Sequence, residues 1–257
     1  MKLRVFGSGS KGNALALRSG NTLLFVDCGF TCRELGRRMS ACGVDPDGAS
    51  GLFFTHDHTD HCKGLSTFHN RHPQVPLYAN GNTADAISVL TGVDEGWRVF
   101  ETAETFQVGD VSVTSFSIPH DAADPVGYLF YDGESALFVG TDMGSATFGV
   151  KDALARATCA VLESNHDPVL LKMSDRPVSL KQRISGRCGH LSNGDAADLV
   201  REVRPPRLKT LLLAHLSQQC NAPYLAREAM EPAVADLGRN VTLDVLEQDS
   251  PSALYEF

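Results

Sequence analysis

The segment Thr55–His61 holds three histidines and two aspartates among seven residues, directly after a short apolar run that we expect to form a buried strand. Neutral imidazole and carboxylate are ligands that Zn²⁺ and related divalent ions prefer. His56 and His58, two residues apart, would point the same way at the end of an extended strand. Asp60 and His61 follow at once and can turn toward a second position. The segment therefore predicts a loop that offers ligands to two adjacent metal ions; the alternative is a polar loop with solvated histidines.

Further along the chain, other apolar runs end in residues that can bind a metal ion. The run Val111–Ile118 is followed by His120, and another apolar run is followed by Asp142. A leucine-rich run ends at His215, and an earlier strand-like run ends at Asp27. One histidine at the end of a strand is a weak signal, whereas several in succession favour a shared site at one edge of a fold.

These motifs, in this order, resemble those of the metallo-β-lactamase superfamily of hydrolases, and the likeness covers essentially the whole chain. Periodicity alone gives only an α/β or α+β fold. The resemblance implies an αββα four-layer sandwich, with residues 1–257 as a single domain. It also implies that Asp27 orients the metal loop, which is the segment Thr55–His61. The ligand set that it implies is His56, His58 and His120 for a first metal ion, Asp60, His61 and His215 for a second, and Asp142 as the bridge.

The chemistry expected of such a pair of ions is hydrolysis by metal-activated hydroxide. A bound Zn²⁺ ion can lower the pKa of water from about 15.7 to about 7, which is on the order of 12 kcal/mol toward forming hydroxide. A general base contributes only roughly 3–5 kcal/mol. We therefore expect the metal centre, with Asp60 as one of its ligands, to supply the nucleophile. Nitrogen-rich ligation favours Zn²⁺, with Mn²⁺ and Fe²⁺ as alternatives.

Two more histidines lie in motifs that resemble one branch of the superfamily, the bacterial YycJ/WalJ-type hydrolases. Glu163-Ser164-Asn165-His166 follows an apolar run, and Gly189-His190-Leu191-Ser192-Asn193 precedes a helix-like stretch. The branch is associated with phosphodiester cleavage and is proposed to act as a 5′–3′ DNA exonuclease. By this likeness His190 is a proton donor or phosphate binder, and His166 is a catalytic residue on the substrate side. The alternatives are a helix-capping role for His190 and a structural polar contact for His166.

The net charge of the chain and the local distribution of its basic residues favour different candidate functions. The formal net charge of −8 argues against an extended basic surface for nucleic acid. One local basic patch is present, and its alternative interpretation is a solvated helix face. The patch consists of Lys172, Arg176, Lys181, Arg183 and Arg187. This basic patch favours a nuclease that acts on a DNA end. The negative net charge of the whole chain favours the alternative, a small-molecule hydrolase of the same fold that acts on a cyclic phosphodiester, lactone or thioester. A non-catalytic scaffold is disfavoured because no ligand is lost, and a redox protein is disfavoured because redox relatives have a flavin partner domain or a different set of ligands for the first metal.

Composition limits the class of protein. The 257 residues are 42% hydrophobic and 21% charged, which is ordinary for a globular chain, and no apolar run approaches the roughly 18 residues that span a bilayer. The first residues reach glycine and serine too soon for a signal peptide, so we expect a cytoplasmic protein. The seven cysteines form no C-x-x-C pair, and we expect most to be buried thiols.

Overall fold

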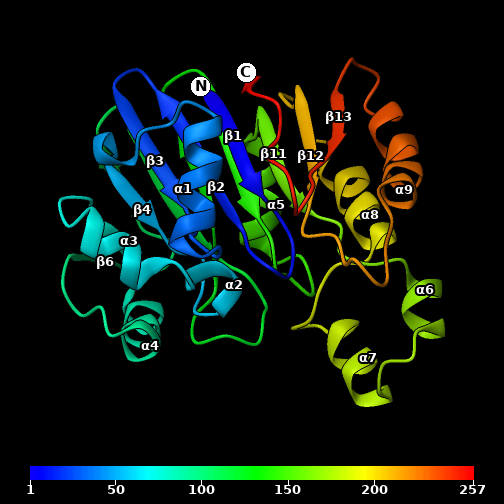
Figure 1. Ribbon diagram of the computed structural model, residues 1–257. Helices are drawn as coiled ribbons and strands as arrows, with labels where there is room; N and C mark the ends of the chain where they lie inside the picture. Colours follow the sequence, from blue (N-terminus) through cyan, green and yellow to red (C-terminus); the bar gives the residue numbers. More distant parts are fainter.

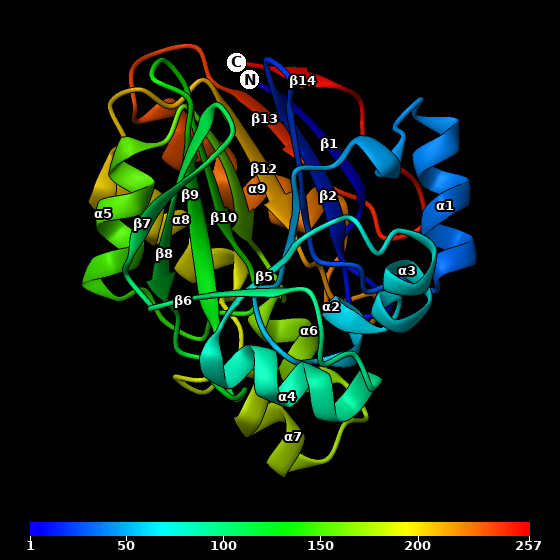
Figure 2. The ribbon, with the colours of Figure 1, turned by 90° about the vertical axis from the view of Figure 1, so that its left-hand side faces the viewer.

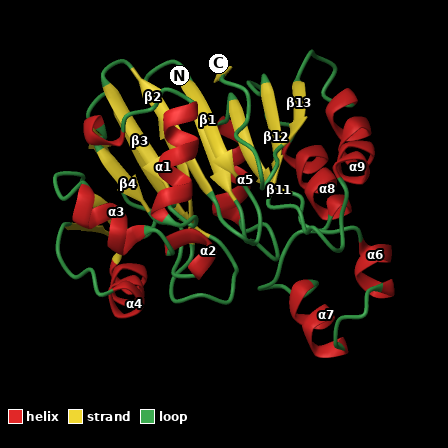
Figure 3. Ribbon diagram, in the orientation of Figure 1, coloured by secondary structure: helices red, strands yellow, loops and turns green.

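Two mixed sheets of seven strands each lie face to face in the computed structural model, which describes residues 1–257 (Figure 1 and Figure 3). Across the first sheet the order is β14 (Tyr255–Glu256), β1 (Lys2–Gly7), β2 (Ala14–Ser19), β3 (Thr22–Val26), β4 (Gly51–Phe53), β5 (Leu77–Asn80) and β6 (Trp97–Phe100). Across the second it is β13 (Thr242–Val245), β12 (Thr210–Ala214), β11 (Cys159–Glu163), β10 (Ala136–Gly140), β9 (Val126–Tyr131), β8 (Val111–Ser117) and β7 (Thr105–Val108). The expected four-layer sandwich is confirmed.

Helices cover both outer faces of the two sheets (Figure 2). The first sheet is covered by α1 (Cys32–Ala41), α3 (Leu65–Arg71) and α4 (Gly81–Thr91), and the second by α5 (Phe148–Arg156), α8 (Asn193–Val203) and α9 (Pro223–Ala235). The short helices are α2 (Thr59–Cys62), α6 (Pro168–Met173) and α7 (Val178–Ile184), with the 3₁₀ turn Pro46–Gly48. No helix has the combination of length and apolar character that crossing a bilayer requires.

The sandwich is held by three apolar layers, one between the sheets and one under each set of helices. In the middle layer Phe53 stacks on Tyr78 with 4.5 Å between ring centroids and meets Tyr128 edge-on at 5.5 Å. Each fully buried large apolar side chain contributes about 1.5–3 kcal/mol through its removal from water. These contacts lock the two sheets together, so the loops at their edges are carried on a rigid frame.

Strand direction brings the loops of interest to one edge. β3, β4 and β5 are parallel neighbours in the first sheet, as are β10, β11, β12 and β13 in the second. Parallel neighbours end at the same edge, so the segments after β3, β4, β10, β11 and β12 emerge together. The chain termini meet at the opposite end, where the Met1 amino group donates to the carbonyl of Phe257 at 3.1 Å (Figure 1). The predicted gathering of strand ends is therefore present.

Two local features differ from the expectations drawn from sequence. Asp60 and His61 were expected in a loop, but both lie in α2, because the chain closes into a helical turn directly after His58. The segment before His190, for which the sequence indicated a basic patch or a solvated helix face, folds into two short helices, α6 and α7. Proline at the first position of α6 and proline just before α7 fix where these short helices begin.

Candidate metal centre

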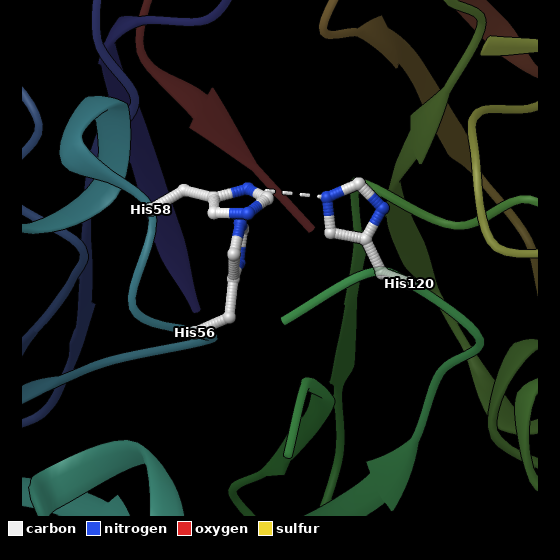
Figure 4. Close-up of side chains that lie close together, drawn as sticks. All are labelled: His56, His58 and His120. Carbon is white, nitrogen blue, oxygen red and sulfur yellow. Dashed lines mark hydrogen bonds between the residues drawn. The ribbon is translucent and has the colours of Figure 1, made fainter. Parts of the chain in front are cut away.

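Three imidazoles converge between the two sheets (Figure 4). His56 and His58 belong to the turn between β4 and α2, and His120 follows β8 in the second sheet. The Nδ1 atom of His58 lies 3.3 Å from the Nε2 atom of His120. Nitrogen atoms of all three rings lie within 4.8 Å of one another, which is close enough for one ion to contact each of them.

A second group adjoins the first and shares one carboxylate with it. Asp60, His61 and His215 bring a ligand atom each within 4.8 Å of the other two. Asp142 lies between the groups: its Oδ2 is 3.1 Å from Nε2 of His61 and its Oδ1 is 3.9 Å from Nε2 of His120. The structure thus brings together all seven of the predicted ligands, in two adjoining groups with Asp142 between them.

Unpaired buried atoms show that these side chains fit cations. His56 Nε2 and His215 Nε2 are buried and have no hydrogen-bond partner, and Asp142 Oδ2 has only the ring nitrogen of His61 beside it, at 3.1 Å. Leaving such an atom unsatisfied costs about 1–3 kcal/mol. Unlike the other buried unpaired atoms, Nδ1 of His69 and Nδ1 of His166, all three belong to groups of side chains that could hold a metal ion. The donor set and these free atoms are consistent with a dinuclear metal site.

Burial and close charged neighbours shift the pKa values of the histidines and carboxylates of the centre in the metal-free protein. Burial and neighbouring imidazoles hold the pKa of His56 well below its usual value. Burial would lower the pKa of His215, but the surrounding carboxylates, Asp142 first among them, raise it to about 10. Burial would raise the pKa of Glu163, but His190 and His215 hold it down to about 2. The centre is therefore rich in anionic carboxylates, which favours a divalent cation.

Asp27 supports the metal loop from behind, as the resemblance implied. Its Oδ1 accepts a hydrogen bond from the backbone N–H of Thr55 at 2.9 Å, and its Oδ2 lies 2.8 Å from Nδ1 of His61. Asp27, Asp142 and His215 all have left-handed backbones, with φ of 59°, 57° and 56°. Such a conformation costs a non-glycine residue roughly 1–3 kcal/mol and tends to persist where a functional site requires it.

Glu163 is a functional residue that the sequence interpretation missed. It ends β11, is fully buried, and its Oε1 lies 2.9 Å from Nδ1 of His190 and 3.0 Å from Nδ1 of His215. Its Oε2 accepts the backbone N–H groups of Met143 and Leu191 at 2.9 and 3.1 Å. The signal was present, since Glu163 is a carboxylate at the end of an apolar strand.

The two remaining candidates have different positions. His190 lines the cavity, and the N-cap of α8 is Ser192, so the capping alternative for His190 does not hold. His166 is only 3% exposed, does not line the cavity and pairs through its backbone with Ser192. The position of His166 therefore does not support the predicted substrate contact, because the side chain is enclosed by protein.

A cavity of about 240 Å³ opens over the centre. Its walls combine ligand-type residues with residues from α7 and the loops beside it. The lining residues are Ser10, His58, Asp60, His120, Asp121, Asp142, Arg176, Leu180, Arg183, Ile184, Gly189, His190 and His215. Cys62 and Cys220, each near a predicted ligand in sequence, are buried and absent from this wall. The cavity is thus polar, with two arginines facing the ligand groups.

Known proteins share this sequence and architecture. Residues 22–215 match the family described as the beta-lactamase superfamily domain. The exodeoxyribonuclease YycJ of Bacillus anthracis is 34% identical, over 92% of this chain and 90% of its own length. The exodeoxyribonuclease WalJ of Streptococcus pneumoniae D39 is 31% identical, over 98% of this chain and 96% of its own. In fold, the metallo-beta-lactamase fold protein YhfI of Bacillus subtilis superposes over the whole of both chains, with a TM-score of 0.74 and 16% identity.

Proposed function

The chain belongs to the metallo-β-lactamase superfamily of metal-dependent hydrolases, and on this premise we propose that it is a phosphodiesterase that degrades DNA from an end in the 5′–3′ direction. The observation that carries the proposal is the shared cavity, in which the ligand groups, His190 and two arginines face one volume. The two relatives that span nearly the whole chain are both named exodeoxyribonucleases, which supports DNA as the substrate class.

We keep the distribution of ligands between two ions that the resemblance implies, and the distances within the two groups support it. His56, His58 and His120 would hold the first ion, Asp60, His61 and His215 the second, and Asp142 would bridge them. When bound, two such ions supply Lewis-acid stabilisation of the charge on a phosphoryl group and activate water. Zn²⁺ suits the nitrogen-rich set, and Mn²⁺ or Fe²⁺ are the alternatives. The protein contributes the fixed positions of these side chains, each at a strand end or in α2.

We assign to His190 the transfer of a proton to the leaving oxygen. Glu163 holds its Nδ1 atom at 2.9 Å, which leaves Nε2 as the ring nitrogen free to act in the cavity. A proton held at Nε2 can pass to the oxygen that departs when the phosphodiester breaks. Glu163 also contacts His215, so one carboxylate orients the proton donor and a metal ligand together. The arrangement needs no separate strong base from the chain.

The test compares two substrates with protein reconstituted with Zn²⁺, Mn²⁺ or Fe²⁺. One substrate is a 5′-phosphorylated DNA duplex labelled separately at each end, and the other is bis(p-nitrophenyl) phosphate. His58→Ala, which removes one predicted ligand, controls for contaminating nuclease. We expect metal-dependent shortening from the 5′ end that the variant lacks.

Other outcomes would revise the proposal in defined ways. Shortening from the 3′ end would reverse the polarity. Turnover of the small diester alone, with the duplex intact, would assign the site to a small-molecule phosphodiesterase, for which the modest cavity of about 240 Å³ is the supporting observation. Activity unchanged in His58→Ala would remove the metal assignment.

A further inference from the structure

We propose that Arg176 binds a second phosphate of the substrate, the one adjoining the diester that is cleaved; this inference rests on the proposed nuclease function. The loop that joins α6 to α7 carries Arg176 to the wall of the catalytic cavity. The two helices lie apart from the sandwich, beyond the edge where the ligand loops emerge (Figure 1).

A small apolar cluster holds this pair of helices in place. Leu171 of α6 and Ile184 of α7 pack with Cys220 from the loop after β12, and Leu180 packs against them. The backbone N–H of Asp167 donates to the carbonyl of Cys220 at 2.8 Å. Both helices are thereby fixed to the loop that follows the predicted ligand His215, so the position of Arg176 relative to the centre is set by the fold.

Contacts within the basic patch leave one cation free at the cavity. Of its five members, only Arg176 and Arg183 line the cavity. Lys181 donates its Nζ proton to the carbonyl of Lys172 at 2.7 Å, and Lys172 itself is exposed outside the cavity wall. Arg183 forms an ion pair with Asp121, so its charge is compensated. The patch that the sequence indicated therefore contributes one uncompensated charge to the site.

Arg176 is oriented without being neutralised. Its Nε donates to Oε1 of Gln219 at 3.2 Å, and no carboxylate lies within 4.0 Å of its guanidinium. Gln219 is a neutral amide, so the contact fixes the side chain but leaves the full positive charge. The guanidinium keeps its terminal N–H donors, whose planar fork matches two oxygens of one phosphate. An arginine oriented in this way presents its positive charge and its terminal N–H donors to an anion.

The charge of a second hollow argues against a phosphate site there. This hollow, of about 490 Å³, is lined in part by the residues that follow His215, and Gln218, Glu247 and Asp249 are among its lining residues. Its wall includes two acids and no lysine or arginine. A phosphate would be repelled from that hollow and attracted to the cavity wall. Among the residues that line the cavity, Arg176 is therefore the one whose positive charge is unpaired and available to a second phosphate group.

The experiment pairs each variant with a substrate that lacks one charge. Three oligonucleotide duplexes are compared: one fully charged with a 5′-phosphate, one with a 5′-hydroxyl end, and one with a neutral methylphosphonate at the linkage on the 3′ side of the first cleaved diester. We expect Arg176→Ala to raise KM for the charged duplex about ten- to hundredfold, the range for loss of a hydrogen bond to a charged group. We also expect wild-type protein to lose a similar factor in kcat/KM on one of the two altered duplexes.

Combining the Arg176→Ala variant with each altered duplex identifies the phosphate that Arg176 contacts. If Arg176 binds the missing phosphate, Arg176→Ala loses nothing further on that duplex, because the interaction is already absent. Arg176→Lys keeps the charge but lacks the planar set of N–H donors. Its KM for the charged duplex should therefore lie between that of the wild-type protein and that of Arg176→Ala. Gln182→Ala, exposed in the same pair of helices but outside the cavity, is the control and should leave kcat/KM for all three duplexes unchanged.

Additive losses on both altered duplexes, or an Arg176→Ala variant with wild-type KM, would overturn the inference while leaving the nuclease function in place. If wild-type protein cleaves none of the duplexes, the proposed function itself fails and the inference fails with it. Metal content and thermal midpoint, measured for every variant, separate a lost contact from a lost fold.

Discussion

The carboxylate of Asp27 meets the imidazole of His61 inside the protein, with 2.8 Å between Oδ2 and Nδ1. The contact engages Nδ1 of His61, so Nε2 is the ring nitrogen that faces the centre, 3.1 Å from Oδ2 of Asp142 and 3.0 Å from Nδ2 of Asn13. Because Asp27 also accepts a hydrogen bond from the backbone N–H of Thr55, the same carboxylate holds the start of the metal loop and one of its ligands. A residue that touches no ion thereby controls the geometry of the second ligand group.

Asp27→Asn should weaken metal binding without unfolding the protein. The amide keeps the size of the side chain but loses the charge that orients His61, and changes to such outer partners typically cost about 10–100-fold in metal affinity. Titration against a competing chelator measures the affinity and the stoichiometry. Asp85→Asn, on the exposed face of α4, is the control. Wild-type affinity in Asp27→Asn would show that His61 needs no such support.

Variants of His190 and Glu163 should have different effects when the rate of reaction and the metal content are both measured. His190→Ala should lower kcat by about 10²–10⁴-fold, the usual contribution of a positioned acid, while both ions stay bound. Glu163→Gln should lower kcat and also weaken binding of the ion held by His215, because Glu163 contacts both histidines. Loss of an ion from His190→Ala would instead identify His190 as a ligand.

The close approach of Gly29 to Asp60 supplies a third prediction. A Cβ atom at Gly29 would lie 1.6 Å from the backbone oxygen of Asp60, so Gly29→Ala must displace α2 or the chain before α1. We expect a loss of about 2 kcal/mol or more in unfolding free energy together with reduced metal content. Gly36→Ala is the matched control: nothing lies within 4 Å of its Cβ, and it should stabilise α1 by about 0.5–1 kcal/mol. Denaturant unfolding and metal analysis test both.

The resemblance of the motifs to a known superfamily implied the ligand set, and the strand ends explain why several of its members gather. His120, Asp142 and His215 each come after an apolar run, and parallel strands deliver such residues to one edge. Glu163 obeys the same rule but was missed, because its motif also contains His166, a more familiar catalytic residue type. Only the structure shows that Glu163 turns into the centre while His166 is enclosed by protein. Side-chain direction at the end of a strand depends on backbone angles that the residue types do not reveal.

The elements that sequence did not predict are short and irregular. α6 and α7 have six and seven residues, too few for a helical period of apolar residues to stand out. Their attachment depends on Cys220, far away in sequence, so the pair could not be placed over the cavity in advance. For the same reason the basic patch could be seen but not resolved into compensated and free charges. That distinction needed Asp121 and Gln219, which belong to other loops.

A last prediction concerns acid stability away from the centre. Arg38 is buried and donates to the carbonyls of Phe6 and Gln248, each at 2.7 Å, while its Nε donates to Glu34. Hydrogen bonds from Arg37 and Arg38 lower the pKa of Glu34 from 4.5 to about 2. Because the folded-state pKa is depressed, the stabilisation by Glu34 is complete above about pH 4.5 and is lost as the pH falls toward 2.

Glu34→Gln should therefore cost about 0.5–1 kcal/mol at neutral pH, because the side chain is 34% exposed and the amide oxygen can still accept a hydrogen bond, while Arg37 and Arg38 lose their counter-ion. The cost should shrink as the pH drops from about 4.5 to 2, where the wild-type carboxylate also loses its charge. Urea unfolding at pH 7, 4.5 and 3 measures the difference, and Glu228→Gln, exposed on α9 without an ion pair, is the control. A cost independent of pH would show that the side-chain geometry of Glu34, and not its charge, holds Arg38 in place.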